Sequence, residues 1–196
     1  MLADTRTKDM ALSRLMDLYV AIGLALTIAA EVLAILSTAL PYWFSASLDN
    51  GKVNVHAGLF KLCANDLGTG FVCVDYDGWL GLGPGGVPGW LKVAQAMMIL
   101  SVIAFAGGIV LASMYVAKVR DWVMLIVASA ALTMAGVAFG VVGTSVAGSK
   151  FNELTPPDDP ATGNLHAAFG LGVVAVLNAA AAAISLGLAW IKIVKS

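Results

Sequence analysis

The sequence predicts an all-α transmembrane four-helix bundle that carries a small extracellular antiparallel β-sheet. Of its 196 residues, 60% are hydrophobic and only 12% are charged, whereas ordinary globular chains carry roughly 25% charged residues. Four apolar segments each contain the ~20 residues that a helix needs to cross a bilayer. The net charge of −1 argues against the basic patch that nucleic-acid binding requires, so the expected partner is the lipid bilayer.

The chain is predicted to form a single four-span membrane domain over residues 1–196. The predicted spans are 18–40, 93–117, 122–146 and 166–191. The other segments are an N-terminal segment (1–17), a first loop (41–92), a tight turn (118–121), a second loop (147–165) and a tail (192–196). The first span is longer than the 7–15-residue apolar core of a signal peptide, so we expect it to be retained.

Basic residues are distributed unevenly between the two sides of the predicted bundle. Four spans place both termini on one side, together with the tight turn. That side carries seven of the eleven Lys and Arg, and the two long loops carry the other four, Lys52, Lys61, Lys92 and Lys150. Because Lys and Arg accumulate in cytoplasmic segments, we expect a multi-pass plasma-membrane protein with cytoplasmic termini and two extracellular loops.

The only two cysteines, Cys63 and Cys73, both lie in the first loop. Disulfides persist in oxidising extracellular compartments, so we predict one Cys63–Cys73 bridge, with two free thiols as the alternative. A structural zinc site takes four ligands, whereas this loop offers the two cysteines and His56. A redox motif has the spacing C-x-x-C, and here nine residues intervene. We therefore expect no metal and no cofactor.

The first loop has the composition of a small sheet. Polar and apolar residues alternate along part of KVNVHAGLFKL (52–62). β-Branched and aromatic residues are frequent in GFVCVDY (70–76), and turn residues separate the two segments. This pattern predicts two strands around a turn. WFSAS (43–47) and KFNEL (150–154) offer further strands, which an isolated hairpin needs for stability in water. Four aromatic residues are expected to anchor the sheet at the membrane interface: Trp43, Phe60, Trp79 and Trp90.

The first loop carries a motif of widely spaced residues. A tryptophan follows the first span, a Gly-Leu-Phe-x-x-Cys stretch comes next, and a second cysteine follows ten residues on: Trp43, Gly58, Leu59, Phe60, Cys63 and Cys73. With this motif the chain resembles the claudin, peripheral myelin protein and epithelial membrane protein superfamily of four-span proteins, whose marks are a Trp after the first span, then Gly-Leu-Trp-x-x-Cys, then a second Cys about ten residues on. The motif Trp is replaced by Phe60. Gln95 stands where claudins usually carry Arg, which is more similar to the myelin and epithelial branch.

The resemblance implies a claudin-like fold and a function in cell–cell adhesion, junction formation or membrane organisation through the external loops. Such proteins assemble laterally, in cis, and across cells, in trans, so we expect a homo-oligomer at cell junctions. Three acidic loop residues, Asp66, Asp75 and Asp77, are candidates for selecting cations if a paracellular pathway forms. The alternative from another class is an auxiliary, gamma-type subunit that modulates an ion channel or receptor.

No enzyme signature is present, so we expect no catalytic residues. The two histidines, His56 and His166, have no nucleophile motif beside them. Glu31 is the one formal charge inside a predicted span, and a charge at the bilayer centre costs ~2.5–3.5 kcal/mol on insertion scales. Asn178, at comparable depth, is a candidate hydrogen-bond partner. A buried interhelical hydrogen bond is favoured over an ion or proton pathway, because no second ionisable residue lies at that depth.

Overall fold

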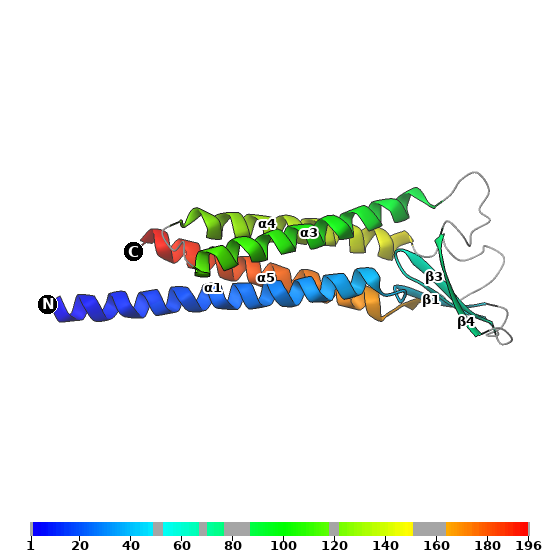
Figure 1. The fold of residues 1–196 in the computed structure, drawn as a ribbon, viewed down its shortest axis with the longest axis horizontal. Helices are drawn as coiled ribbons and strands as arrows, with labels where there is room; N and C mark the ends of the chain where they lie inside the picture. The colour runs from blue at the N-terminus through cyan, green and yellow to red at the C-terminus, as the bar shows by residue number, and fades with distance from the viewer. Residues whose placement is uncertain are drawn as a thin grey trace.

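Four long helices lie side by side, and a small sheet covers one end of the bundle (Figure 1). The computed structural model describes residues 2–48, 53–66, 70–76, 87–117, 122–150 and 164–195. Its long helices are α1 (Leu2–Ala39), α3 (Gly89–Ala117), α4 (Met124–Lys150) and α5 (Ala167–Lys195). Both termini lie at the end opposite the sheet (Figure 1), which we call the terminal end; the other is the sheet end.

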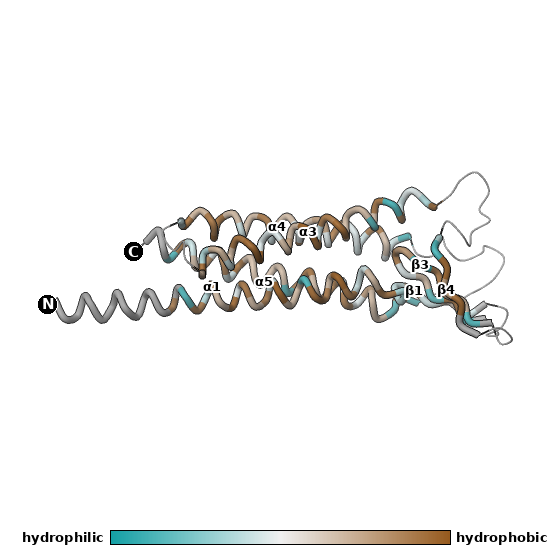
Figure 2. The backbone as a smooth tube through the Cα atoms, in the orientation of Figure 1, coloured by the Kyte–Doolittle hydropathy of each residue, from teal (hydrophilic) through white to brown (hydrophobic). Residues whose placement is uncertain are grey.

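Each of these helices is long and apolar enough to cross a membrane, as the sequence predicts. The qualifying stretches are 17–39, 89–117, 124–150 and 167–192, and apolar residues predominate along them (Figure 2). The predicted first span, 18–40, agrees with the stretch 17–39, and the helix α1 itself begins further upstream, at Leu2. Residues 1–17 contain no Gly or Pro, the two residues that most strongly interrupt a helix, so the helix continues through this polar segment.

The helices pack unequally around the bundle. α1 packs mainly on α5, and α3 mainly on α4, while contact between α1 and α3 is less extensive. Small residues allow the close approaches: a Cβ atom at Gly136 would lie 2.5 Å from the Phe105 ring, and one at Gly23 would lie 2.7 Å from Leu186. This agrees with the general use of small residues where membrane helices meet.

The sheet has five antiparallel strands in the order β4-β3-β2-β1-β5. They are β1 (Phe44–Leu48), β2 (Val53–Ala57), β3 (Lys61–Asp66), β4 (Gly70–Asp75) and β5 (Asn164–Leu165). The predicted sheet is confirmed, including a strand from WFSAS. The segment 52–62 was expected to form one strand, but it turns back at Gly58 and supplies two. Of KFNEL, Lys150 ends α4 and residues 151–154 lie outside the described residues.

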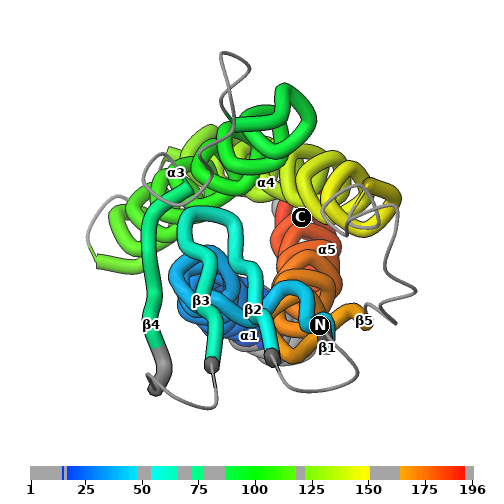
Figure 3. The backbone as a smooth tube through the Cα atoms, turned by 90° about the vertical axis from the view of Figure 1, so that its right-hand side faces the viewer, coloured from blue at the N-terminus to red at the C-terminus, as the bar shows by residue number. Residues whose placement is uncertain are grey.

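The sheet is packed onto the helices. Figure 3 looks onto this end and shows β2 and β3 in front of α1, with β5 beside β1. One hydrophobic cluster joins the two parts, and its large buried members are Trp43, Phe44, Leu59, Leu62, Tyr76, Leu91 and Met98. The sheet end is therefore one packed unit, and the candidate motif residues lie within it.

Candidate functional site

The Gly-Leu-Phe sequence forms the connection between β2 and β3 and packs against the end of α1. The Gly58 N–H donates a hydrogen bond to the Lys61 carbonyl at 2.8 Å. A Cβ atom at Gly58 would lie 2.6 Å from Pro41 Cα and 2.9 Å from the Leu40 carbonyl oxygen. These neighbours are backbone atoms that cannot rotate away. Glycine is required here because the two chain segments approach too closely for any side chain.

Two side chains from other elements hold this turn in place. Gln95 on α3 donates its Nε2–H to the Leu59 carbonyl at 2.6 Å. Tyr76, which follows β4, donates its hydroxyl to the Gly58 carbonyl at 2.7 Å. Burial raises the pKa of Tyr76, so its hydroxyl stays protonated and remains a donor. The turn carbonyls are thus satisfied by α3 and by the residue after β4, a role for Gln95 that the resemblance did not supply.

Trp43 connects three parts of the chain. Its ring is fully buried, and its Nε1–H donates to the Ser37 carbonyl on α1 at 2.6 Å. Its backbone N–H donates to Ala57 on β2 at 3.0 Å, and its carbonyl accepts from the N–H of His166 at 2.9 Å. The expectation that Trp43 anchors the sheet in the lipid interface is wrong, because the ring fills the interior of the junction between sheet and helices.

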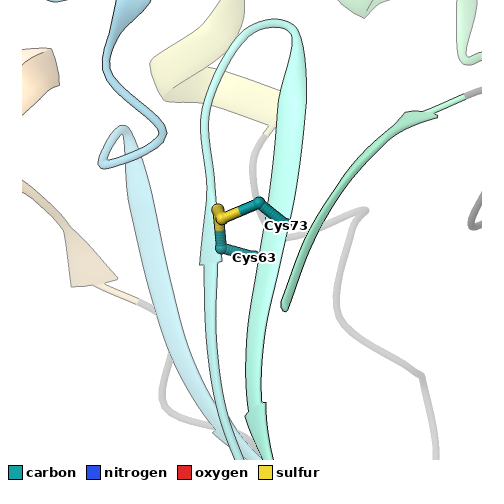
Figure 4. Close-up of a disulfide and its surroundings, with 2 residues drawn as sticks. All are labelled: Cys63 and Cys73. Carbon is teal, nitrogen blue, oxygen red and sulfur yellow. A yellow bond between two sulfur atoms is a disulfide. The ribbon is translucent and has the colours of Figure 1, made fainter. Parts of the chain in front are cut away.

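The predicted disulfide is confirmed. Cys63 on β3 and Cys73 on β4 are bonded (Figure 4), and they are direct partners in the antiparallel register. Both cysteines of the chain are therefore in the disulfide, and neither is a free thiol. The bridge joins the edge strand β4 to the strand that carries the packed turn.

Phe60 differs from its neighbour Leu59 in exposure, since 38% of its surface is accessible. It lies between two hollows. One is a groove of about 350 Å³ between α1 and α3, with an entirely apolar lining that includes Ile35 and Ile103. The other is a pocket of about 550 Å³ at the sheet end, where Asp75, Lys92 and Gln95 contribute polar groups. The role of Phe60 as an anchor at the membrane interface stays a prediction.

Two of the candidate ion-selecting residues, Asp66 and Asp75, lie at well-separated positions of the sheet. Asp75 ends β4 opposite Lys61, whereas Asp66 ends β3 opposite Gly70. Five residues of strand separate the two positions, which is roughly 17 Å at ~3.4 Å per residue. Asp77 and the predicted anchor Trp79 lie outside the described residues. Asp75 is exposed and lies beside the sheet-end pocket, so it is the candidate whose surroundings the structure describes.

The predicted hydrogen bond between Glu31 and Asn178 does not form. Glu31 on α1 is partly buried, and its Oε2 is buried with no hydrogen-bond partner among the described residues. Asn178 donates instead to the Val174 carbonyl of its own helix at 3.1 Å. The i−4 carbonyl is close to any polar side chain on a helix, so it competes effectively with a group on a neighbouring helix.

A cluster of three rings at the sheet end was not predicted. Tyr42, His56 and His166 have ring centroids 5.1 Å (Tyr42–His56), 5.7 Å (Tyr42–His166) and 5.8 Å (His56–His166) apart. His56 lies on β2, and His166 lies between β5 and α5. The sequence separates the histidines by more than a hundred residues, and the only available signal was that His56 sits in the first loop and His166 at the start of the predicted fourth span.

The chain matches no protein-family model. In the part of the chain that the structure describes, no group of three or more His, Cys, Asp or Glu side chains is placed to hold a metal ion. Of the residues that the sequence singled out, Trp43, Gly58, Leu59 and Gln95 meet at the junction of sheet and helices. Their arrangement is that of a scaffold that presents a sheet at the end of a helix bundle.

Replacing Gly58 by alanine is expected to lower the free energy of unfolding by about 1–3 kcal/mol, the usual range for overpacking a well-packed site. The new Cβ would clash with the backbone of Leu40 and Pro41. To relieve the clash, β2 and β3 would have to move away from the helices. Equilibrium unfolding in detergent micelles measures the change. Gly89→Ala is the matched control, because a Cβ there meets nothing within 4 Å. Equal effects of the two substitutions would contradict the close-packed turn.

Stability is expected to fall on mild acidification. Burial and the nearby His166 hold the pKa of His56 below its ordinary value, so the unfolded chain binds this proton more tightly than the folded chain. The contribution of His56 to the free energy of unfolding is complete above pH ~6.5, the ordinary pKa of histidine. It is lost as the pH falls through the lower pKa that His56 has in the folded state. Melting temperatures at pH 7.5 and 5.5 should differ less in His56→Gln than in the parent. An equal fall in both proteins would show that His56 does not contribute.

Proposed function

We propose that this protein is a claudin-like adhesion protein of the plasma membrane that presents its sheet outside the cell. Two features support this orientation. Seven of the eleven Lys and Arg belong to the two termini and the 118–121 turn, which is the cytoplasmic pattern. The disulfide lies at the opposite end of the bundle, in the sheet, and disulfides persist outside the cytosol.

The observation that carries the adhesion proposal is the rigid mounting of the sheet. The Trp43 hydrogen bonds and the Gly58 turn fix the sheet relative to the helices, and the disulfide ties β3 to β4 within the sheet. A surface held in its binding conformation loses less entropy when it meets a partner. A sheet mounted in this way at the end of four apolar helices is suited to binding a protein on the membrane of a neighbouring cell.

Lateral association through the sheet edge is part of the same proposal. β4 is an edge strand of the described sheet, and its Val72 side chain is 52% exposed. Edge strands present backbone N–H and C=O groups that can pair with another chain. We therefore propose that copies of this chain associate in cis, with β4 as the contact strand.

Adhesion is tested in mixed cultures of host cells that form no junctions of their own. Two populations express the protein with different labels, and a third population does not express it and carries no label. Enrichment is expected where two expressing cells touch and not where an expressing cell touches a non-expressing one. A Cys63→Ala/Cys73→Ala variant should lose this enrichment, whereas Met124→Ala should keep it. Met124 is an exposed residue at the terminal end and serves as the matched control. Uniform surface distribution of the parent protein would contradict the proposal.

We further propose that any paracellular pathway favours cations through Asp75. This residue is exposed and lies beside a 550 Å³ pocket at the sheet end, and carboxylates favour cations in such pathways. Asp75→Asn is expected to shift the reversal potential of an expressing monolayer toward lower preference for sodium over chloride. Lys92→Gln removes a positively charged side chain from the same pocket, so it should shift the reversal potential toward higher preference for sodium over chloride. Indifference to both substitutions would exclude this pathway.

A second candidate function is that of an auxiliary subunit of an ion channel or receptor. The observation that favours it is the apolar groove of about 350 Å³ between α1 and α3. Such a groove within the membrane would fit a helix of a larger protein, with Phe60 at its outer mouth. Co-purification of a channel that is lost in Ile103→Trp, combined with a uniform surface distribution, would favour this function over adhesion.

A further inference from the structure

The apolar groove between α1 and α3 adjoins the sheet-end pocket, because Phe60 lines both. The groove has a volume of about 350 Å³ and is apolar throughout. The pocket has a volume of about 550 Å³ and contains the charged side chains of Asp75 and Lys92. A ligand that fills both hollows therefore needs a long apolar part with a charged group at one end.

The two hollows lie at different depths along α3. Lys92 lies in the first turn of this helix, and residues 93–117 contain no charged side chain, so Lys92 stands at the boundary between headgroups and hydrocarbon. Ile99 and Ile103 line the groove and lie roughly 10 and 16 Å further along the helix, at ~1.5 Å per residue. One leaflet contributes about 15 Å of hydrocarbon. The groove is therefore at the depth of acyl chains, and the pocket is at the depth of headgroups.

The pocket offers one charge of each sign to a ligand. Asp75 and Lys92 are both exposed, so each side chain can turn toward a bound molecule. The ammonium group of lysine binds phosphate, and a carboxylate attracts the ammonium group of a lipid headgroup. Phe60, at the boundary of the two hollows, is 38% exposed, and the face of an aromatic ring also attracts a quaternary ammonium group. The pocket thus complements both charges of a zwitterionic headgroup.

We propose that the groove and the pocket together bind one phospholipid with a choline headgroup, such as phosphatidylcholine. One acyl chain lies in the groove between Ile35 and Ile103. The phosphate contacts Lys92, and the choline group lies between Asp75 and Phe60. The auxiliary-subunit alternative places a protein helix in the same groove, but an apolar helix would leave the two opposite charges beside Phe60 without partners. The lipid site does not depend on the proposed adhesion function.

Lipid binding to the full-length chain in detergent micelles tests the proposal. Native mass spectrometry gives the stoichiometry and the affinity for phosphatidylcholine and for phosphatidylglycerol with the same acyl chains, which keeps the phosphate and lacks the ammonium group. We expect one phosphatidylcholine per chain, bound roughly tenfold more tightly than phosphatidylglycerol. Phosphocholine, the headgroup without acyl chains, should bind roughly a hundredfold more weakly than the lipid. Equal affinity for the two lipids, or for phosphatidylcholine and phosphocholine, would overturn the proposal.

Substitutions of exposed residues separate the headgroup contacts from the acyl-chain contacts. Asp75→Asn should abolish the preference for phosphatidylcholine, whereas Lys92→Gln should weaken the binding of both lipids roughly tenfold. Ile103→Trp fills the groove and should weaken both lipids equally. Leu177→Trp on α5 is the matched control, because Leu177 is 65% exposed and Ile103 is 62% exposed, and it should bind lipid as the parent does. An unchanged preference in Asp75→Asn, or equal losses in the two tryptophan variants, would contradict the proposed site.

Discussion

Replacing Trp43 by alanine is expected to lower the free energy of unfolding by about 3–5 kcal/mol, the usual cost of removing a large buried aromatic side chain. The ring is fully buried and contacts Phe169 on α5 edge-on, with the ring centroids 5.7 Å apart. Its loss leaves a cavity between the sheet and the helices, and the Ser37 carbonyl loses a hydrogen bond. Equilibrium unfolding in mixed detergent micelles measures the change.

Two control variants separate the contributions of the Trp43 ring and its N–H group. Trp43→Phe keeps most of the packing and removes the bond to Ser37, so it should cost roughly 1–3 kcal/mol, the penalty for a buried group left without its partner. Trp122→Ala changes a tryptophan that is 65% exposed and should have little effect. If Trp43→Ala were no more damaging than Trp122→Ala, the sheet would not depend on this junction.

The second large effect is expected from Cys63→Ala combined with Cys73→Ala. The bridge closes a loop whose ends are 10 residues apart, and the loss of that constraint on the unfolded chain costs at most ~3 kcal/mol. The helices do not depend on the bridge, so the loss should be confined to the sheet. Hydrogen exchange should therefore accelerate in β3 and β4 and remain unchanged in α4 and α5.

Treatment of the parent protein with a mild reductant is the control for this pair of substitutions. Reduction should reproduce the accelerated exchange in the sheet without any change of sequence. If exchange accelerated equally in the helices, the sheet and the bundle would unfold as one unit, and the local role of the bridge would be wrong.

Much of the fold could be predicted because lipid imposes strong and simple constraints. A stretch of some twenty apolar residues can hardly be anything but a spanning helix, so the four helices were evident from residue type alone. The disulfide was predictable for a similar reason, since the chain has only two cysteines and they lie in one loop. A strand from WFSAS was expected only because an isolated hairpin needs further strands to be stable in water.

The remaining features depend on contacts between segments that are distant in the sequence. The turn at Gly58 exists because Leu40 and Pro41 come within contact distance, and nothing in the residues around Gly58 indicates that approach. Trp43 has the composition of an interface anchor but is buried by β2 and α5. The Glu31–Asn178 bond failed because Asn178 finds an acceptor on its own helix. The pairing of His56 with His166 similarly requires knowledge of how the two loops meet.

The side of the membrane on which the sheet lies is the central claim, and the cysteine content makes it directly testable. Intact cells are treated with a membrane-impermeant maleimide polymer, with and without prior exposure to an impermeant reductant. Because the chain has only two cysteines, both in the disulfide, any label reports on the sheet alone. We predict no labelling without reductant and addition of two polymers after reduction. Labelling that requires permeabilised cells would place the sheet in the cytoplasm and contradict the proposed adhesion function.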